Sequence, residues 1–284
     1  MRQAVDVQQK GTSIGGVQIS NLRYADDVAL LAENETDLHV LLQNVSQESL
    51  KYDLQMNVKK TKILVCSKHK ESVNMQLNGE QVEQVNEFMY LGATCSSTND
   101  NSKEIRKRLS IAGHKFTQIQ NLLKDRSLTV NIKIRLLRAL IFPIAIYGCE
   151  AWTLKKVDTK SISAFELWCY RRILCVTCKD RRTNEWVLTQ ISPKERLLTT
   201  VKRLKLQYFG HVARGSAGDL ASTILQGKTQ GTRNRGRPRT SWQSNITSWT
   251  GLSLHDATQA AQNRPEWRLI SSLAATYPQD EDGT

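Results

Sequence analysis

The sequence has few aromatic residues, few prolines and no long apolar run. Phe, Trp and Tyr make up 6% of its 284 residues, and only five residues are Pro. The longest apolar stretch without a charge runs from Ala139 to Cys149 and contains Pro143, whereas a membrane-spanning helix needs about 20 apolar residues. The start of the chain lacks the apolar segment of a secretory signal peptide. We therefore expect an intracellular protein, in the nucleus or the cytoplasm, with no membrane partner and with reduced cysteines.

Acidic residues are scarce in the second part of the chain. Residues 1–100 hold nine Lys and Arg against thirteen Asp and Glu, a net charge of −4. Residues 101–284 hold thirty-one against fourteen, a net charge of +17. This asymmetry predicts that the second part contacts a polyanion, RNA or DNA. The alternative is a basic surface without a specific ligand.

The first hundred residues have a mixed strand and helix pattern. Short apolar runs predict strands at 17–19, 22–25 and 28–32, and apolar spacing after Asn34 predicts a helix that Asn34 caps. Asn78-Gly79 favours a tight hairpin turn. We expect residues 81–85 and 88–91 to complete a small antiparallel sheet.

After residue 100 the apolar period becomes helical. Helices are predicted over 105–123, over 132–140 with an end or kink at Pro143, and over 159–176. Another is expected to start at Ser192, where a capping box with Pro at the first helical position begins. A Gly- and Arg-rich linker covers 227–240, and two short helices follow, at 242–249 and 254–261.

Two adjacent carboxylates, Asp26 and Asp27, stand at a predicted hairpin turn. Their repulsion at a separation of ~4–5 Å amounts to roughly 3–4 kcal/mol at an effective dielectric near 20. A divalent cation would remove this cost, and hard oxygen ligands suit Mg²⁺. Pairs of such ions drive in-line phosphoryl transfer. The alternative is a solvated turn.

Two further motifs have alternative interpretations. Four arginines fall within residues 233–239, and their Arg-Gly-Arg core is similar to an AT-hook that lies in a narrow minor groove. The alternative is a flexible basic linker. Cys175 and Cys178 form a CxxC motif with Cys169 nearby, but a zinc site needs further ligands at short spacing. The simpler interpretation is that these cysteines are reduced residues of a helix that pack in the fold or bind nothing.

Several motifs, in order, resemble the reverse transcriptase of a LINE-type (non-LTR) retrotransposon. The similarity extends over about residues 14 to 271. It rests on Tyr24-Ala25-Asp26-Asp27, which resembles polymerase motif C, on residues 56–62 (motif D), on Phe88-Met89-Tyr90-Leu91-Gly92 (primer grip), on residues 145–152 (thumb), and on residues 203–212 and 235–242 (the carboxy-terminal region).

The resemblance implies an α+β fold in four parts. Residues 1–100 would be a partial palm of antiparallel β-hairpins with a helix, and 101–155 a helical thumb. Residues 156–226 would be a basic helical region, and 227–284 the Arg/Gly linker with short helices. The reaction of the intact family enzyme is RNA-templated DNA synthesis from deoxynucleoside triphosphates with two Mg²⁺ ions.

The resemblance also assigns roles to single residues. Asp26 would bind Mg²⁺ with Asp27 beside it, and Lys60 would assist the departing pyrophosphate. Nucleic acid would contact residues of the motif C and primer-grip segments and of the arginine cluster: Tyr24, Ala25, Phe88, Tyr90, Gly92, Arg233, Arg235, Arg237 and Arg239.

The sequence departs from the family upstream of Tyr24. We find no motif A aspartate, motif B or fingers, and the single carboxylate before Tyr24 is Asp6, which lacks the acidic or aromatic neighbour of motif A. We therefore expect a carboxy-terminal piece of a polymerase that does not polymerise by itself. The alternatives are a non-catalytic nucleic-acid-binding remnant or reused protein, and an incomplete gene model.

Overall fold

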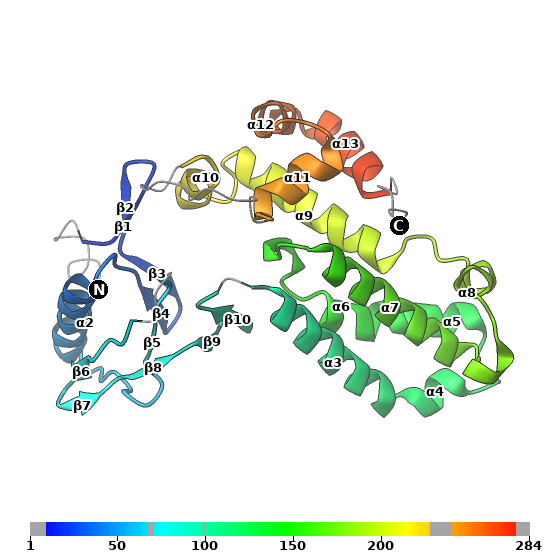
Figure 1. Cartoon of the computed structure of the whole chain (residues 1–284), viewed down its shortest axis with the longest axis horizontal. Helices are drawn as coiled ribbons and strands as arrows, with labels where there is room; N and C mark the ends of the chain where they lie inside the picture. The colour runs from blue at the N-terminus through cyan, green and yellow to red at the C-terminus, as the bar shows by residue number, and fades with distance from the viewer. Residues whose placement is uncertain (1–9, 68–70, 99, 228–239, 277–284) are drawn as a thin grey trace. The chain divides into compact units, whose positions relative to one another are not determined.

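The computed structural model describes residues 10–67, 71–98, 100–227 and 240–276. The chain divides into two compact units, which are described separately. Unit 1 comprises Met1–Asn99 with Ala217–Gly236, and unit 2 comprises Asp100–Ser216 with Arg237–Thr284. Unit 1 contains strand pairs and helices, and unit 2 contains helices (Figure 1). This combination confirms the α+β class. Among the described residues, no helix combines the length and the apolar character that crossing a bilayer requires. The finer division of residues 101–284 into three segments stays a prediction.

In the part of unit 1 that the structure describes, the strands form five separate two-stranded sheets rather than one continuous sheet. Four of them are antiparallel hairpins, and β5 with β8 is parallel. The pairs are β1 (Thr12–Ile14) with β2 (Val17–Ile19), β3 (Asn21–Tyr24) with β4 (Asp27–Leu30), β5 (Lys62–Leu64) with β8 (Glu83–Val85), β6 (Gln76–Leu77) with β7 (Glu80–Gln81), and β9 (Glu87–Tyr90) with β10 (Ala93–Ser96).

The parallel pair corrects the expected antiparallel sheet. Lys62 of β5 lies opposite Glu83 of β8, and their side chains form an ion pair of 2.5 Å. A parallel return needs a connection of a dozen or more residues, and residues 65–82 are long enough to provide it. The β6–β7 hairpin, with its Asn78-Gly79 turn, lies within this connection. The next strand, β8, therefore pairs with β5 in the parallel direction and not as a hairpin.

Two local predictions in unit 1 are confirmed. Helix α2 (Glu35–Leu50) begins after Asn34, whose side chain accepts a hydrogen bond from the Asp37 amide at 2.8 Å. Asn78 and Gly79 both have a left-handed backbone, with φ of 53° and 82°, as a type I′ turn requires. The core of the unit joins α2 to the strands through Leu42, Ile63, Met75, Leu77 and Val82.

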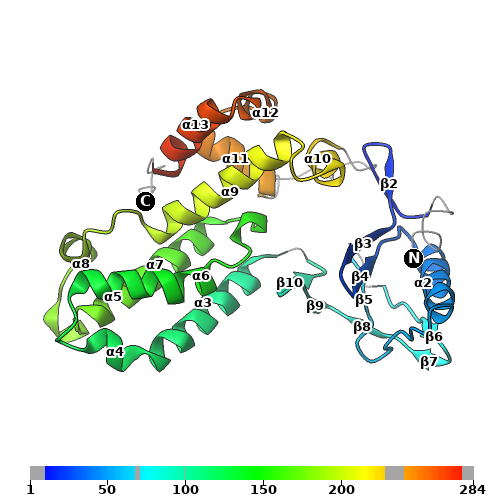
Figure 2. The same ribbon diagram turned by 180° about the vertical axis from the view of Figure 1, so that it is seen from behind.

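Unit 2 is helical. A single apolar cluster reaches from Ile105 to Val201. Figure 2 shows α11, α12 and α13 gathered on α9, and α3 beside α7. The helices are α3 (Ser102–Gln118), α4 (Gln120–Lys124), α5 (Val130–Leu136), α6 (Phe142–Ala145), α7 (Lys156–Ile173), α8 (Asn184–Ile191), α9 (Leu197–Ala213), α11 (Trp242–Thr250), α12 (Leu254–Gln262) and α13 (Arg264–Thr276). The predicted short helices at 242–249 and 254–261 are confirmed; α13 was not predicted, nor was α10 (Asp219–Gln226) of unit 1.

In unit 2 one helix prediction needs correction, and at Pro143 the structure excludes one of the two predicted alternatives, a helix end. The helix over 105–123 is interrupted at Ile119, so that α3 and α4 are separate. Before Pro143 the chain does not end its helix but passes through a π-helical turn, Leu137–Ile141, into α6. Proline has no N–H to donate to the preceding turn, and a π-turn accommodates the change.

The predicted helix start at Ser192 is wrong. Ser192 ends α8 with a left-handed backbone, φ 44°, and α9 begins five residues later at Leu197. The Leu197 amide donates to Glu166 Oε1 of α7 at 2.8 Å, and the Arg196 Nε donates to Glu166 Oε2 at 2.6 Å. A side chain from another helix therefore caps α9, in place of the local capping box.

Candidate functional site

The β3–β4 hairpin places the two adjacent aspartates at its tip. Tyr24 lies opposite Asp27 in the register, so the loop consists of Ala25 and Asp26 and not of Asp26 and Asp27 as expected. Ala25 has a left-handed backbone with φ 48°, while Asp26 does not. This φ pattern is that of a type II′ loop, in which glycine is usual at the first position. The loop holds Tyr24, Ala25, Asp26 and Asp27 exposed to solvent.

Tyr90 joins the primer-grip-like hairpin to the aspartate hairpin. Its hydroxyl donates to the backbone carbonyl of Leu22 on β3, a long hydrogen bond of 3.4 Å. Burial raises the pKa of Tyr90, and the negative charge of Asp27 raises it further.

The Leu91-Gly92 loop of the β9–β10 hairpin is left-handed at both residues, with φ of 48° and 77°. Phe88 and Tyr90, two residues apart on β9, are half-buried on the same strand face.

Lys60 lies in a turn that Asn57 stabilises. The Lys60 amide donates to the Asn57 carbonyl and to Asn57 Oδ1, each at 3.1 Å, and the side chain of Lys60 is exposed. Within the residues that the structure describes, no hydrogen bond or ion pair joins the Lys60 side chain to Asp26 or Asp27. The structure therefore brings Tyr90 toward the aspartates and leaves Lys60 in a separate turn.

The donor set at the hairpin tip consists of two carboxylates. One or two carboxylates together with substrate phosphates are a usual Mg²⁺ site. A two-metal clamp needs more ligands, and nowhere in the described ranges do three or more His, Cys, Asp or Glu side chains gather as a metal site would require. Asp6 lies outside the described residues. The residues present fit weak binding of one cation by Asp26 and Asp27 and do not fit a two-metal centre.

The remaining sequence motifs are only partly described. Arg233, Arg235, Arg237 and Arg239 lie outside the described residues, as does the side chain of Cys178. Cys169 is buried in α7, and burial raises the pKa of its thiol far above the ordinary range. Cys175 is exposed at the end of that helix.

The exposed charge on α3 and α7 is entirely basic. The three acidic side chains of these helices, Glu104, Asp158 and Glu166, are buried. Glu104 pairs with Arg108 of the same helix at 2.7 Å, and Asp158 accepts the Lys155 amide at 3.0 Å. The charged side chains that remain exposed or half-buried on the two helices are Lys103, Arg106, Lys107, Arg108, Lys115, Lys156, Lys160, Arg171 and Arg172.

A buried lysine in α9 was missed by the sequence analysis. Lys205 is fully buried, and its Nζ donates to the Trp152 carbonyl at 2.6 Å and to Asn245 Oδ1 at 2.8 Å. The Trp242 ring lies 5.0 Å from the same nitrogen. Burial lowers the pKa of Lys205 to about 7. The available signal was the spacing: Lys205 stands four residues from Val201 and from Phe209, in the apolar stripe of the helix.

Comparison with known proteins gives two matches. Residues 2–95, about a third of the chain, match the family model of reverse transcriptases (RNA-dependent DNA polymerases). The chain is 26% identical over 275 residues to an uncharacterized transposon-derived protein of Caenorhabditis elegans, an alignment that covers 90% of this chain and 96% of that protein. No solved structure matches. The segment with the aspartate and primer-grip-like hairpins is thus similar to reverse transcriptases, and the similarity to the worm protein extends through both units.

Proposed function

We propose that this chain descends from the reverse transcriptase of a LINE-type retrotransposon and acts as a nucleic-acid-binding protein without polymerase activity of its own. The observation that carries the proposal is the contrast between the two parts. The hairpin tip offers two exposed carboxylates, Asp26 and Asp27. Unit 2 buries its acidic side chains on α3 and α7 and presents basic ones.

The basic surface supports RNA or DNA as the partner. Lys and Arg side chains that neutralise phosphates release counterions, so the affinity falls as salt rises. The pairing of Glu104, Asp158 and Glu166 within the fold keeps their charges from opposing a polyanion at the helix surfaces. The match to reverse transcriptases supports nucleic acid over other polyanions.

The second candidate function is RNA-directed DNA polymerisation by the chain itself. The exposed Asp26–Asp27 pair and the packing of Tyr90 beside β3 favour it. In that case Mg²⁺ and deoxynucleoside triphosphates are further ligands, and Asp26 and Asp27 hold the metal. The two-carboxylate donor set counts against this candidate.

Primer extension distinguishes the two functions. The purified full chain and its Asp26→Ala, Asp27→Ala double variant are given a poly(rA)/oligo(dT) duplex, Mg²⁺ and dTTP, and binding to the same duplex is measured across salt concentrations. We expect no extension by either protein and equal, salt-sensitive binding by both. Extension that the double variant lacks would establish the polymerase instead.

A further inference from the structure

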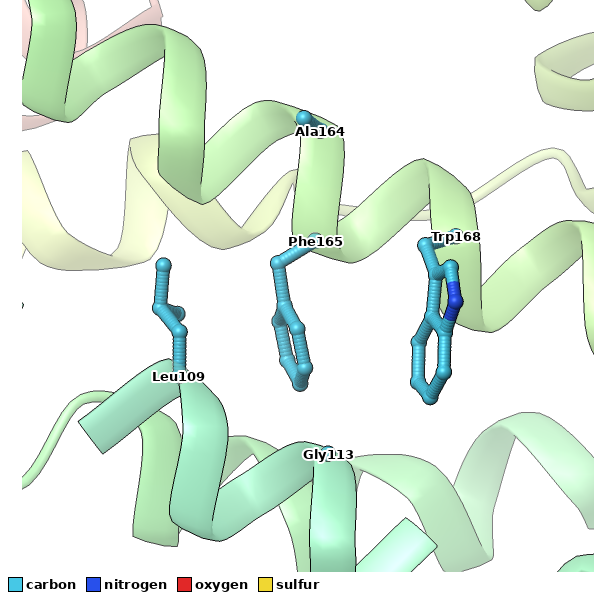
Figure 3. Close-up of a pocket in the computed structure, with 5 residues that line it drawn as sticks. All are labelled: Leu109, Gly113, Ala164, Phe165 and Trp168. Carbon is cyan, nitrogen blue, oxygen red and sulfur yellow. The ribbon is translucent and has the colours of Figure 1, made fainter. Parts of the chain in front are cut away.

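An apolar groove lies within unit 2, between α3 and α7. It has a volume of about 370 Å³ and is lined by Leu109 and Gly113 of α3 and by Ala164, Phe165 and Trp168 of α7. Figure 3 shows the rings of Phe165 and Trp168 directed from α7 toward α3, with Leu109 extending from α3 beside Phe165. Ligand sites in proteins are concave and mostly apolar, and start near 300 Å³. The groove has the size of a site for one small, flat group.

The rings in the groove form a stack that ends in a cation. Phe165 and Trp168 are nearly parallel, with an angle of 20° and centroids 5.9 Å apart. The guanidinium carbon of Arg172 lies 4.3 Å from the centroid of Trp168. Both rings are half-buried, so part of each stays accessible. Aromatic side chains and arginine planes are the groups on which unpaired bases stack.

Gly113 keeps the groove open without any packing need for glycine. It lies in the interior of α3, where glycine is among the least favourable residues. Its backbone φ is not left-handed, and a Cβ added there would meet only Phe165 Cε2, at an ordinary contact distance of 3.9 Å. A conformational or steric reason for glycine is therefore lacking in the described surroundings. The glycine leaves an open position on α3 beside the ring of Phe165.

The charges near the groove suit a phosphate backbone. Helical spacing puts Arg106 one turn before Leu109 and Lys160 one turn before Ala164, and both side chains are exposed. The acidic side chains of both helices are buried. A basic protein segment or an uncharged lipid would gain nothing from this one-sided charge, whereas each nucleotide brings one flat base together with one negatively charged phosphate.

We propose that the groove between α3 and α7 binds an unpaired base of single-stranded nucleic acid, which stacks on Phe165. The proposal rests on the proposed nucleic-acid binding of this protein and adds a base-binding subsite to it. The neighbouring phosphates lie toward Arg106 and Lys160. Binding is tolerant of sequence because every base has a flat aromatic face.

Filling the groove tests the proposal. The full chain, its Gly113→Leu variant and a Gln118→Leu control are compared in fluorescence anisotropy with labelled oligothymidylate and with an abasic oligonucleotide of the same length and charge. Gln118 is exposed on the same helix, about half a turn around from the groove. Thermal melting shows that each variant is folded, and Gly113→Leu removes an unfavourable helix residue rather than a core contact.

We expect the wild type and Gln118→Leu to bind oligothymidylate about tenfold tighter than the abasic probe, on the order of stacking one base. Gly113→Leu is expected to lose this preference while its affinity for the abasic probe is unchanged. A preference that persists in Gly113→Leu overturns the proposal. Equal wild-type binding to both probes also overturns it but leaves the proposed function intact, whereas binding to neither probe overturns both. A wild-type dimer that Gly113→Leu abolishes, without a base preference, would assign the groove to a second copy of the chain.

Discussion

The carboxylate of Glu166 on α7 accepts a hydrogen bond of 2.8 Å from the amide of Leu197, the first residue of α9. It also accepts from the Tyr170 hydroxyl at 2.9 Å and from Arg196 at 2.6 Å. One fully buried side chain therefore satisfies a helix N-terminus, a buried hydroxyl and a half-exposed guanidinium. It determines where α9 begins, and α9 carries Lys205 and packs against α12 and α13.

Replacing Glu166 is expected to destabilise the protein strongly. Glu166→Ala leaves the Leu197 amide and the Tyr170 hydroxyl without their acceptor, and breaking a buried pair costs about 3–5 kcal/mol. Urea unfolding followed by helical circular dichroism measures the loss. Glu185→Ala, at an exposed position in the first turn of α8, is the control and should change the free energy of unfolding by less than about 1 kcal/mol. Equal effects of the two variants would contradict the capping role.

The buried amine of Lys205 predicts a distinct pH dependence of stability. Burial lowers its pKa from 10.5 to about 7 in the folded protein. Between these two values the unfolded chain binds more protons than the folded one, so stability rises with pH. A neutral amine has two N–H groups, and these match its two acceptors, the Trp152 carbonyl and Asn245 Oδ1.

The comparison with Lys205→Met isolates this effect. The free energy of unfolding of the wild type, minus that of the variant, should increase by about 1 kcal/mol per pH unit from pH 7 to pH 9. Chemical denaturation at several pH values gives this difference, in which the titration of other groups cancels. A difference that stays constant over this range would mean that the pKa of Lys205 is not lowered.

Charge reversal on the outer surfaces of α3 and α7 should weaken nucleic-acid binding. For Arg106→Glu and Lys160→Glu, we expect lower affinity for any sequence and a log-log salt slope smaller by about one for each lost phosphate contact. Lys59→Glu makes the same change of charge at an exposed position of unit 1 and should have a smaller effect. A matching loss in all three variants would point to net charge alone rather than to this surface.

The left-handed backbone at Ala25 predicts that glycine is tolerated there. Ala25→Gly removes the Cβ that disfavours φ 48°, so the protein should be unchanged or up to about 1 kcal/mol more stable. Ala29→Gly in β4 is the matched control, and it should be less stable by about 0.5–1 kcal/mol because glycine weakens a strand. Urea unfolding of the two variants checks the prediction, which fails if Ala25→Gly is the less stable one.

Local patterns were sufficient where neighbours in the sequence make the structure. Asn34 caps α2 through an amide three residues away, and the Asn78-Gly79 turn needs only two residues with a left-handed backbone. The order of short motifs around Asp26 and Asp27 also indicated the reverse-transcriptase similarity that the family match of residues 2–95 bears out. Because each of these signals spans only a few residues, it can be recognised in the sequence without knowledge of the tertiary structure.

Only the tertiary structure decided the features made by segments far apart in the chain. Glu166 accepts a hydrogen bond from the Leu197 amide thirty-one residues away and so replaces a local capping box, and Asn245 accepts one from Lys205, forty residues away in the chain. The pairing of β5 with β8 and the groove between Gly113 and Phe165 likewise depend on how separate elements pack. The spacing of apolar residues and the helix propensity of a segment predict which face of its helix is apolar, but they do not predict which other helix packs against that face. A buried charge or an open groove depends on that partner.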